Sequence, residues 1–124
     1  MRKVNLNPKG IKACDCVIRA IAYSFEQTWE QTYTDLCQLG LKMKRMPNEK
    51  QVYEKYLELN GWIKHKQPRT AYNLKYTVDE FIKHQIAKKA IISVAHHLTC
   101  IDDYELIDTW NCGRKCVGNY WTKN

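Results

Sequence analysis

The order of two hydrophobic patterns is the feature that most constrains how this chain can fold. Apolar residues recur at helical spacing over four segments, 16–25, 28–39, 48–61 and 77–89. Short apolar runs rich in β-branched residues follow, at 90–95, 97–101, 105–110 and 117–121. Helices followed by consecutive strands are typical of α+β domains rather than of parallel βαβ units. We therefore predict an α+β fold in which N-terminal helices pack on a C-terminal antiparallel β-sheet, built as a meander of consecutive strands.

Local signals predict where the helices begin and end. Asp15 stands at the N-cap position of the first helix. Thr28 and Gln31 form a capping box for the second helix, which is expected to end near Leu39, before Gly40. The third and fourth helices carry caps, capping boxes and terminators of the same kind, at Asn48, Gln51, Gly61, Thr77 and Glu80.

Length and composition indicate one folded domain spanning 1–124. The 124 residues are 44% hydrophobic and 27% charged, a globular balance. No apolar run is long enough to span a bilayer, and the N-terminal stretch lacks the apolar core of a signal peptide. The sequence therefore predicts a cytoplasmic protein without a membrane partner, whose six cysteines are free, metal-bound or catalytic rather than paired in disulfides.

The positive charge of the chain bears on its partners. A formal net charge of +7 would attract nucleic acid or an acidic polypeptide. The basic residues are spread along the chain, however, and no nucleic-acid-binding motif accompanies them. Most of them fit a solvated helix face or loop, and this interpretation is favoured over nucleic-acid binding. The expected partner is a polypeptide substrate, and the basic surface hints at an acidic one.

Cys16 is the most distinctive candidate for chemistry, because it opens the first predicted helix. Unsatisfied N–H groups and the positive end of the helix dipole stabilise a thiolate there. The thiolate is the nucleophile of cysteine chemistry, and it normally works with a histidine that a third group orients. A histidine and an acid should therefore come together with Cys16.

His97 and Asp108 meet that requirement through the predicted hairpin. A two-residue turn at Asp102 and Asp103 would place His97 directly opposite Asp108, on the same face. Asp108 would accept the Nδ1–H of His97 and leave Nε2 to face the thiol. A register slip of one residue would transfer this role to His96.

These residues resemble the papain-like cysteine peptidases. The likeness rests on "DCVIRA" at the head of the first helix, on a histidine opening a strand before "LT", and on "DTW" in the next strand, where many members have Asn-Ser-Trp. It spans Asp15 to Trp121 and is greatest to small cysteine proteases of phages and prophages, whose action would take place in the host cytoplasm.

The resemblance implies a minimal papain-like fold and a cysteine peptidase, a thiol hydrolase that needs no cofactor and no metal. By it, Cys16 is the nucleophile, His97 the general base and acid, and Asp108 the orienting residue, with Asp15 and Trp110 in support. One feature departs from the family: Gly10 stands where its oxyanion glutamine would be. Asn7 or Asn5 is then a candidate for the second oxyanion donor, beside the backbone N–H of the nucleophile.

Three alternatives stay open at this point. Cys14, Cys16, Cys112 and Cys116 could bind a structural zinc ion, although their spacings differ from those of most zinc knuckles. The domain could also be a catalytically idle module that binds a partner, in phage counter-defence or at an acidic or nucleic-acid surface. Acyl transfer to an amine, or deamidation, would use the same three residues as peptide hydrolysis.

Overall fold

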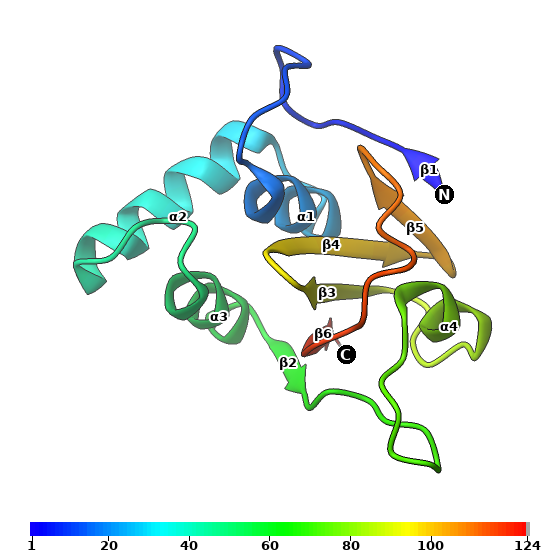
Figure 1. Cartoon of the computed structure of the whole chain (residues 1–124). Helices are drawn as coiled ribbons and strands as arrows, with labels where there is room; N and C mark the ends of the chain where they lie inside the picture. Colours follow the sequence, from blue (N-terminus) through cyan, green and yellow to red (C-terminus); the bar gives the residue numbers. More distant parts are fainter. Residues whose placement is uncertain (124) are drawn as a thin grey trace.

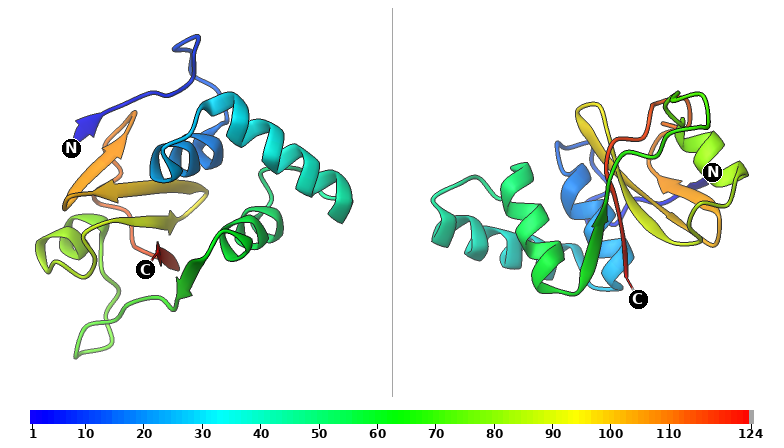
Figure 2. Two further views of the ribbon diagram at one scale, coloured as in Figure 1. Left: turned by 180° about the vertical axis from the view of Figure 1, so that it is seen from behind. Right: turned by 90° about the horizontal axis from the view of Figure 1, so that it is seen from below.

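The computed structural model describes residues 1–123, which form a mixed six-stranded sheet with helices on both of its faces (Figures 1 and 2). In chain order the elements are β1 (Arg2–Lys3), α1 (Cys16–Phe25), α2 (Trp29–Met43), α3 (Lys50–Leu59), β2 (Trp62–His65), α4 (Val78–Lys83), β3 (Ala90–Val94), β4 (His97–Asp102), β5 (Glu105–Asp108) and β6 (Tyr120–Lys123). The predicted α+β class is confirmed. Within this part of the chain, no helix has the length and apolar character that a membrane span requires.

The sheet is not the predicted simple meander. Its strand order is β1-β5-β4-β3-β6-β2, with β1 parallel to β5 and the other neighbours antiparallel. Strands β3 to β5 do form a meander, but β6 pairs with β3, where Trp121 lies opposite Ile91. The segment 109–119 joins β5 to β6, and it is far longer than a hairpin turn. That length lets the chain return across the sheet to the free edge of β3.

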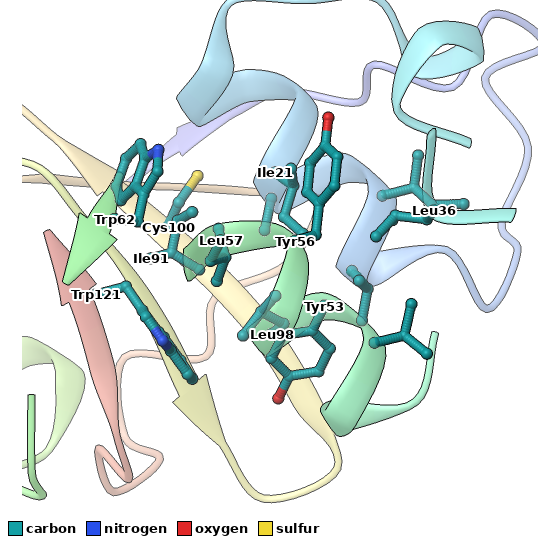
Figure 3. Packing of buried hydrophobic residues seen from close by; sticks show 14 of the residues in the cluster. Ile21, Leu36, Tyr53, Tyr56, Leu57, Trp62, Ile91, Leu98, Cys100 and Trp121 are labelled. Carbon is teal, nitrogen blue, oxygen red and sulfur yellow. The ribbon is translucent and has the colours of Figure 1, made fainter. Parts of the chain in front are cut away.

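Hydrophobic residues of the sheet are divided between two cores. Ile91 and Cys100 lie in the core beneath α1 and α3, whereas their neighbours Ile92 and Ile101 lie in the core beneath α4. Successive side chains of a strand point to opposite faces, so both faces of β3 and β4 are buried. Figure 3 shows the core beneath α1 and α3, to which β6 contributes the buried side chain of Trp121. The central strands are therefore held firmly on both sides.

Two helix boundaries differ from the sequence predictions. Helix α2 continues through the buried Gly40 to Met43, and Lys44 caps it in the left-handed conformation at φ 58°. Helix α3 has Glu49 rather than Asn48 at its N-cap. The predicted stop at Gly40 is wrong because this glycine serves close packing: a Cβ there would lie 2.7 Å from the backbone oxygen of Arg45.

Capping predictions had mixed outcomes. The capping box of α4 is complete, with Thr77 and Glu80 each accepting from the other's backbone N–H. In α2 only half of the predicted box forms. Thr28 accepts from the backbone of Gln31, but the Gln31 side chain donates to Asp35 instead.

Replacing Gly40 by Ala is expected to lower the free energy of unfolding by about 1–2 kcal/mol. Helix propensity alone would predict a gain of about 1 kcal/mol, since Ala is the better helix former. The clash with the Arg45 carbonyl reverses that sign. Urea unfolding measures the change, and Gln38→Ala, at an exposed position of the same helix, is the control. A stabilised Gly40→Ala protein would contradict the packing argument.

Candidate active site

The hairpin of β4 and β5 turns one residue later than predicted. Asp103 and Tyr104 form the turn, both at positive φ (51° and 60°), as a type I′ hairpin turn requires. Continued past the paired residues Cys100 and Ile107, this register sets Asp108 against Thr99, with His97 diagonal to it. The predicted register is therefore wrong by two residues along one strand. Because side chains alternate with a period of two, His97 and Asp108 nevertheless share a face.

The predicted contact between His97 and Asp108 is present, with a different ring atom. His97 Nε2 lies 2.7 Å from Asp108 Oδ2, which leaves Nδ1, rather than Nε2, for Cys16. Thr99 Oγ1 donates to the same carboxylate oxygen at 2.6 Å. His96 lies exposed in the turn between β3 and β4, at φ 56°, so it does not take the role that a register slip would have given it.

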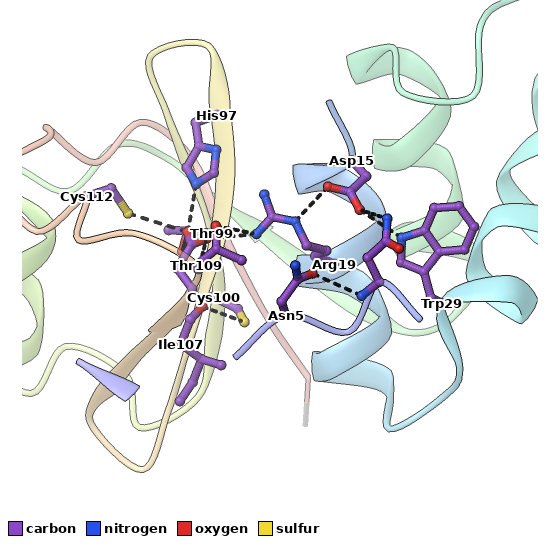
Figure 4. Close-up of polar contacts among 12 residues, drawn as sticks. Asn5, Asp15, Arg19, Trp29, His97, Thr99, Cys100, Ile107, Thr109 and Cys112 are labelled. Carbon is purple, nitrogen blue, oxygen red and sulfur yellow. Dashed lines mark hydrogen bonds and ion pairs between the residues drawn. The ribbon is translucent and has the colours of Figure 1, made fainter. Parts of the chain in front are cut away.

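Asp108 is the centre of a polar network that includes His97, Thr99 and Arg19, which Figure 4 labels. Its other oxygen accepts from the backbone of Thr109 at 2.7 Å and from Arg19 NH1 at 3.0 Å, and the residue is only 4% exposed. Burial by itself raises the pKa of this carboxyl, but the hydrogen bonds from His97, Thr99 and Thr109 outweigh it and lower the pKa to about 2. Asp108 is thus a permanent carboxylate at neutral pH.

Arg19 joins this carboxylate to a second one. It lies one turn into α1, and its Nε contacts Asp15 Oδ1 at 2.8 Å (Figure 4). Asp15 occupies the predicted N-cap position, but its side chain makes no cap hydrogen bond. It accepts instead from Arg19, from Asn7 Nδ2 and from Trp29 Nε1, the latter two at 3.0 Å. The expectation that Asp15 caps the helix through its side chain is therefore wrong, because these three donors occupy the carboxylate.

The same contacts give Asn7 a structural position. Its side-chain N–H donates to Asp15, its side-chain oxygen accepts from the backbone of Lys9, and the residue is buried. A side chain held in this way fixes the loop that precedes α1. The structure thus corrects the suggested use of Asn7 as an oxyanion donor, since its amide is already directed at a buried carboxylate.

Cys16 begins α1 and is partly buried beside His97. Burial raises the pKa of the thiol, but hydrogen bonds from His97 and from the backbone N–H of Leu98, with the charge of Arg19, make the net shift downward. Burial likewise opposes the charge on His97, yet its hydrogen bonds to Asp108, Cys112 and Cys16 raise its pKa to about 11. Both shifts favour a thiolate and imidazolium pair.

Two further side chains surround the imidazole. The ring centroid of Trp110 lies 4.9 Å from that of His97, in the position expected for a residue that shields the His and Asp pair from water. The buried thiol of Cys112 donates to Asp108 Oδ2 at 3.7 Å. The contact with Cys112 was not predicted, because it depends on the path of the long segment between β5 and β6.

The four cysteines considered for zinc do not form a cluster of metal ligands within residues 1–123. The one compact set of potential ligands there consists of His97, Asp108 and Cys112, whose ligand atoms lie within 4.8 Å of one another. Cys14 and Cys116 are exposed and stand outside it. In that set, the oxygen of Asp108 that faces His97 already accepts hydrogen bonds from His97, Thr99 and Cys112. A metal ion would have to displace those bonds.

Sequence reasoning could have found one more member of the network. Thr99 is two residues after His97 on the same strand, so it lies on the same face and within reach of Asp108. An arginine one turn beyond Cys16 could be expected to pair with a carboxylate or to contact substrate, and the structure pairs Arg19 with Asp15 and Asp108. The Leu98 N–H has no sequence signal, because every residue except proline carries one.

Comparison with known proteins adds no relative. No family model matches the chain, and neither the curated proteins nor the solved structures contain a match. The candidate site must therefore be interpreted from its own geometry.

Proposed function

We propose that this chain is a cysteine peptidase with a minimal papain-like fold, in which Cys16, His97 and Asp108 form the catalytic triad. The observation that carries the proposal is the position of His97 between two acidic groups. One ring nitrogen is 2.7 Å from the buried Asp108. On its other side the imidazole acts on the helix-terminal Cys16 and lowers the pKa of that thiol. A thiol placed only for packing needs neither an imidazolium nor a carboxylate behind it.

The proposed reaction begins with the thiolate of Cys16. It attacks the amide carbonyl and forms a carbon–sulfur bond, and the carbon–nitrogen bond then breaks as His97 gives its proton to the departing amine. The acyl group remains as a thioester. Neutral His97 next takes a proton from water, the resulting hydroxide attacks the thioester, and the carboxylic acid leaves as the thiolate forms again. Asp108 stabilises the imidazolium in both halves of this cycle.

The start of α1 supports stabilisation of the oxyanion. The first N–H groups of a helix have no intrahelical acceptor, and the side chain of Asp15 does not cap them. The N–H of Cys16 is therefore the donor that we assign to the developing negative charge. It is the donor that was expected to act beside Asn7, whose amide donates to Asp15 in the structure.

Selective alkylation tests the proposal without requiring a known substrate. At pH 6 and a sub-stoichiometric dose, iodoacetamide is expected to label Cys16 before the other thiols, since an ordinary thiol carries very little thiolate at that pH. His97→Ala should slow labelling of Cys16 about tenfold, because it removes the main group that holds the thiolate. Mass spectrometry of digested protein gives the rate at each cysteine.

Other residues of the chain provide matched controls. His65 is a partly buried histidine of β2, the edge strand at the other end of the sheet from β1 and β5, and its ring bonds to Thr122. His65→Ala should leave the labelling rate of Cys16 unchanged. Cys37, partly buried in α2, gives the reference rate of an ordinary thiol. Labelling of Cys16 at the rate of Cys37, or an unchanged rate in His97→Ala, would refute the peptidase.

A further inference from the structure

A pocket of about 600 Å³ adjoins the candidate triad on the side of the N-terminal segment. Ala13 and Asp15, just before the candidate nucleophile, form part of its wall, and Trp110, which stacks near His97, forms another part. The pocket wall is thus formed by residues that neighbour Cys16 and His97. Within residues 1–123, the described pockets of comparable size lie away from Trp110.

The wall of this pocket combines exposed apolar groups with unneutralised positive charge. Ile11 is 53% exposed and Trp110 is 42% exposed, so both present apolar surface to a ligand in this pocket. Lys3 and Lys12 also line the pocket, and neither takes part in a salt bridge among the described residues. The charge of Arg19, in contrast, is already matched by carboxylates.

We propose that this pocket, defined by Lys3, Ile11, Lys12 and Trp110, binds an acidic peptide segment with an apolar side chain as the specificity site of the enzyme. The apolar side chain would lie against Ile11 and Trp110, and neighbouring carboxylates would face the two lysines. Charge complementarity at exposed sites gives discrimination between partners more than affinity. This inference rests on the proposed function, because the bound segment would present its amide to Cys16.

Matched peptide electrophiles test the pocket. Chloroacetyl-Leu-Glu-Glu-amide and chloroacetyl-Leu-Lys-Lys-amide both alkylate a thiolate, which displaces chloride as the carbon–sulfur bond forms. The acidic probe is expected to label Cys16 about fivefold faster than the basic probe, as two exposed ion pairs allow. In Lys3→Glu/Lys12→Glu the preference should reverse. In about 0.5 M NaCl it should shrink for the original chain, because salt screens exposed charges.

A charge-matched variant shows that position, rather than net charge, determines the preference. Lys66→Glu/Lys75→Glu changes two exposed lysines between β2 and α4, at the end of the molecule away from the N-terminal loop (Figure 1), and should keep the preference for the acidic probe. Lys12→Glu alone changes a loop residue outside any strand. If substitution of Lys3, which lies in β1, unfolds the chain, the preference between the two probes is measured in this single variant instead.

Iodoacetamide separates the two hypotheses. It is too small to need the pocket, so its rate at Cys16 reports only on the nucleophile. Equal rates for the acidic and basic probes, with rapid iodoacetamide labelling of Cys16, would overturn the pocket assignment and leave the proposed peptidase standing. Slow iodoacetamide labelling of Cys16 would overturn both.

Discussion

Asp108→Ala is expected to lower the free energy of unfolding by about 3–5 kcal/mol, the range found when one partner of a buried ion pair is removed. The substitution leaves Arg19 NH1, the His97 ring and the backbone N–H of Thr109 without their common acceptor. The Arg19 and His97 side chains are 12% and 9% exposed, so water cannot fully replace the carboxylate. Equilibrium unfolding in urea measures the loss.

Two further variants define the origin of this loss. Asp108→Asn keeps the shape and one acceptor oxygen, so it should lose less stability than Asp108→Ala. Glu58→Ala removes a largely exposed carboxylate whose contact with Lys55 is 4.0 Å long, and it should change stability by less than about 0.5 kcal/mol. If Asp108→Ala and Glu58→Ala had equal effects, Asp108 would not be the centre of a buried network.

Cys16→Ser is expected to lose about 2 kcal/mol of stability between about pH 7 and pH 9, a steeper loss than that of the original chain. The lowered pKa of Cys16 makes stability rise with pH up to the ordinary thiol value of 9.0. The raised pKa of His97 makes stability fall as pH rises from the ordinary value of 6.5 toward about 11. In the original chain the rising slope of Cys16 opposes the falling slope of His97, because a thiol that ionises on folding releases a proton while the imidazole keeps one.

The serine variant removes only the rising slope. His97 still keeps its proton beside Asp108, whereas an unfolded histidine loses it, so stability decreases with pH. Urea unfolding at several pH values measures the effect, with Cys37→Ser as the matched cysteine control. In Cys16→Ser/His97→Gln both titrating groups are removed, so the free energy of unfolding should not change between about pH 7 and pH 9. Parallel curves for Cys16→Ser and the original chain would mean that the proton stays on the sulfur and that no thiolate and imidazolium pair forms.

Helix α1 and the hairpin show how far sequence patterns determine the site. Apolar spacing predicted the start of α1 at Cys16, because helix periodicity and capping are local properties. The hairpin prediction had the wrong turn and still joined His97 to Asp108. An error of two residues preserves the face of every side chain, whereas an error of one would have reversed it.

Long-range contacts decided what local patterns could not. The position of β6 beside β3 depends on the path of segment 109–119, and no local spacing encodes that path. The roles of the Asp15 and Asn7 side chains were assigned from their place in the sequence. In the structure Asp15 accepts from Arg19 and Trp29, and Asn7 donates to Asp15. A polar group takes whichever buried partner best satisfies it.

The sequence by itself therefore determined the α+β class, the thiol at a helix start, and a histidine and an aspartate on one face of a hairpin. Each of these follows from periodicity or from chemistry within a few residues. Only the tertiary structure decided that Nε2 of His97 meets Asp108, that Arg19 links Asp108 to Asp15, and that a basic and apolar pocket adjoins Trp110. Those features arise where α1, β5 and the N-terminal segment meet, and their geometry is set by packing across the whole chain.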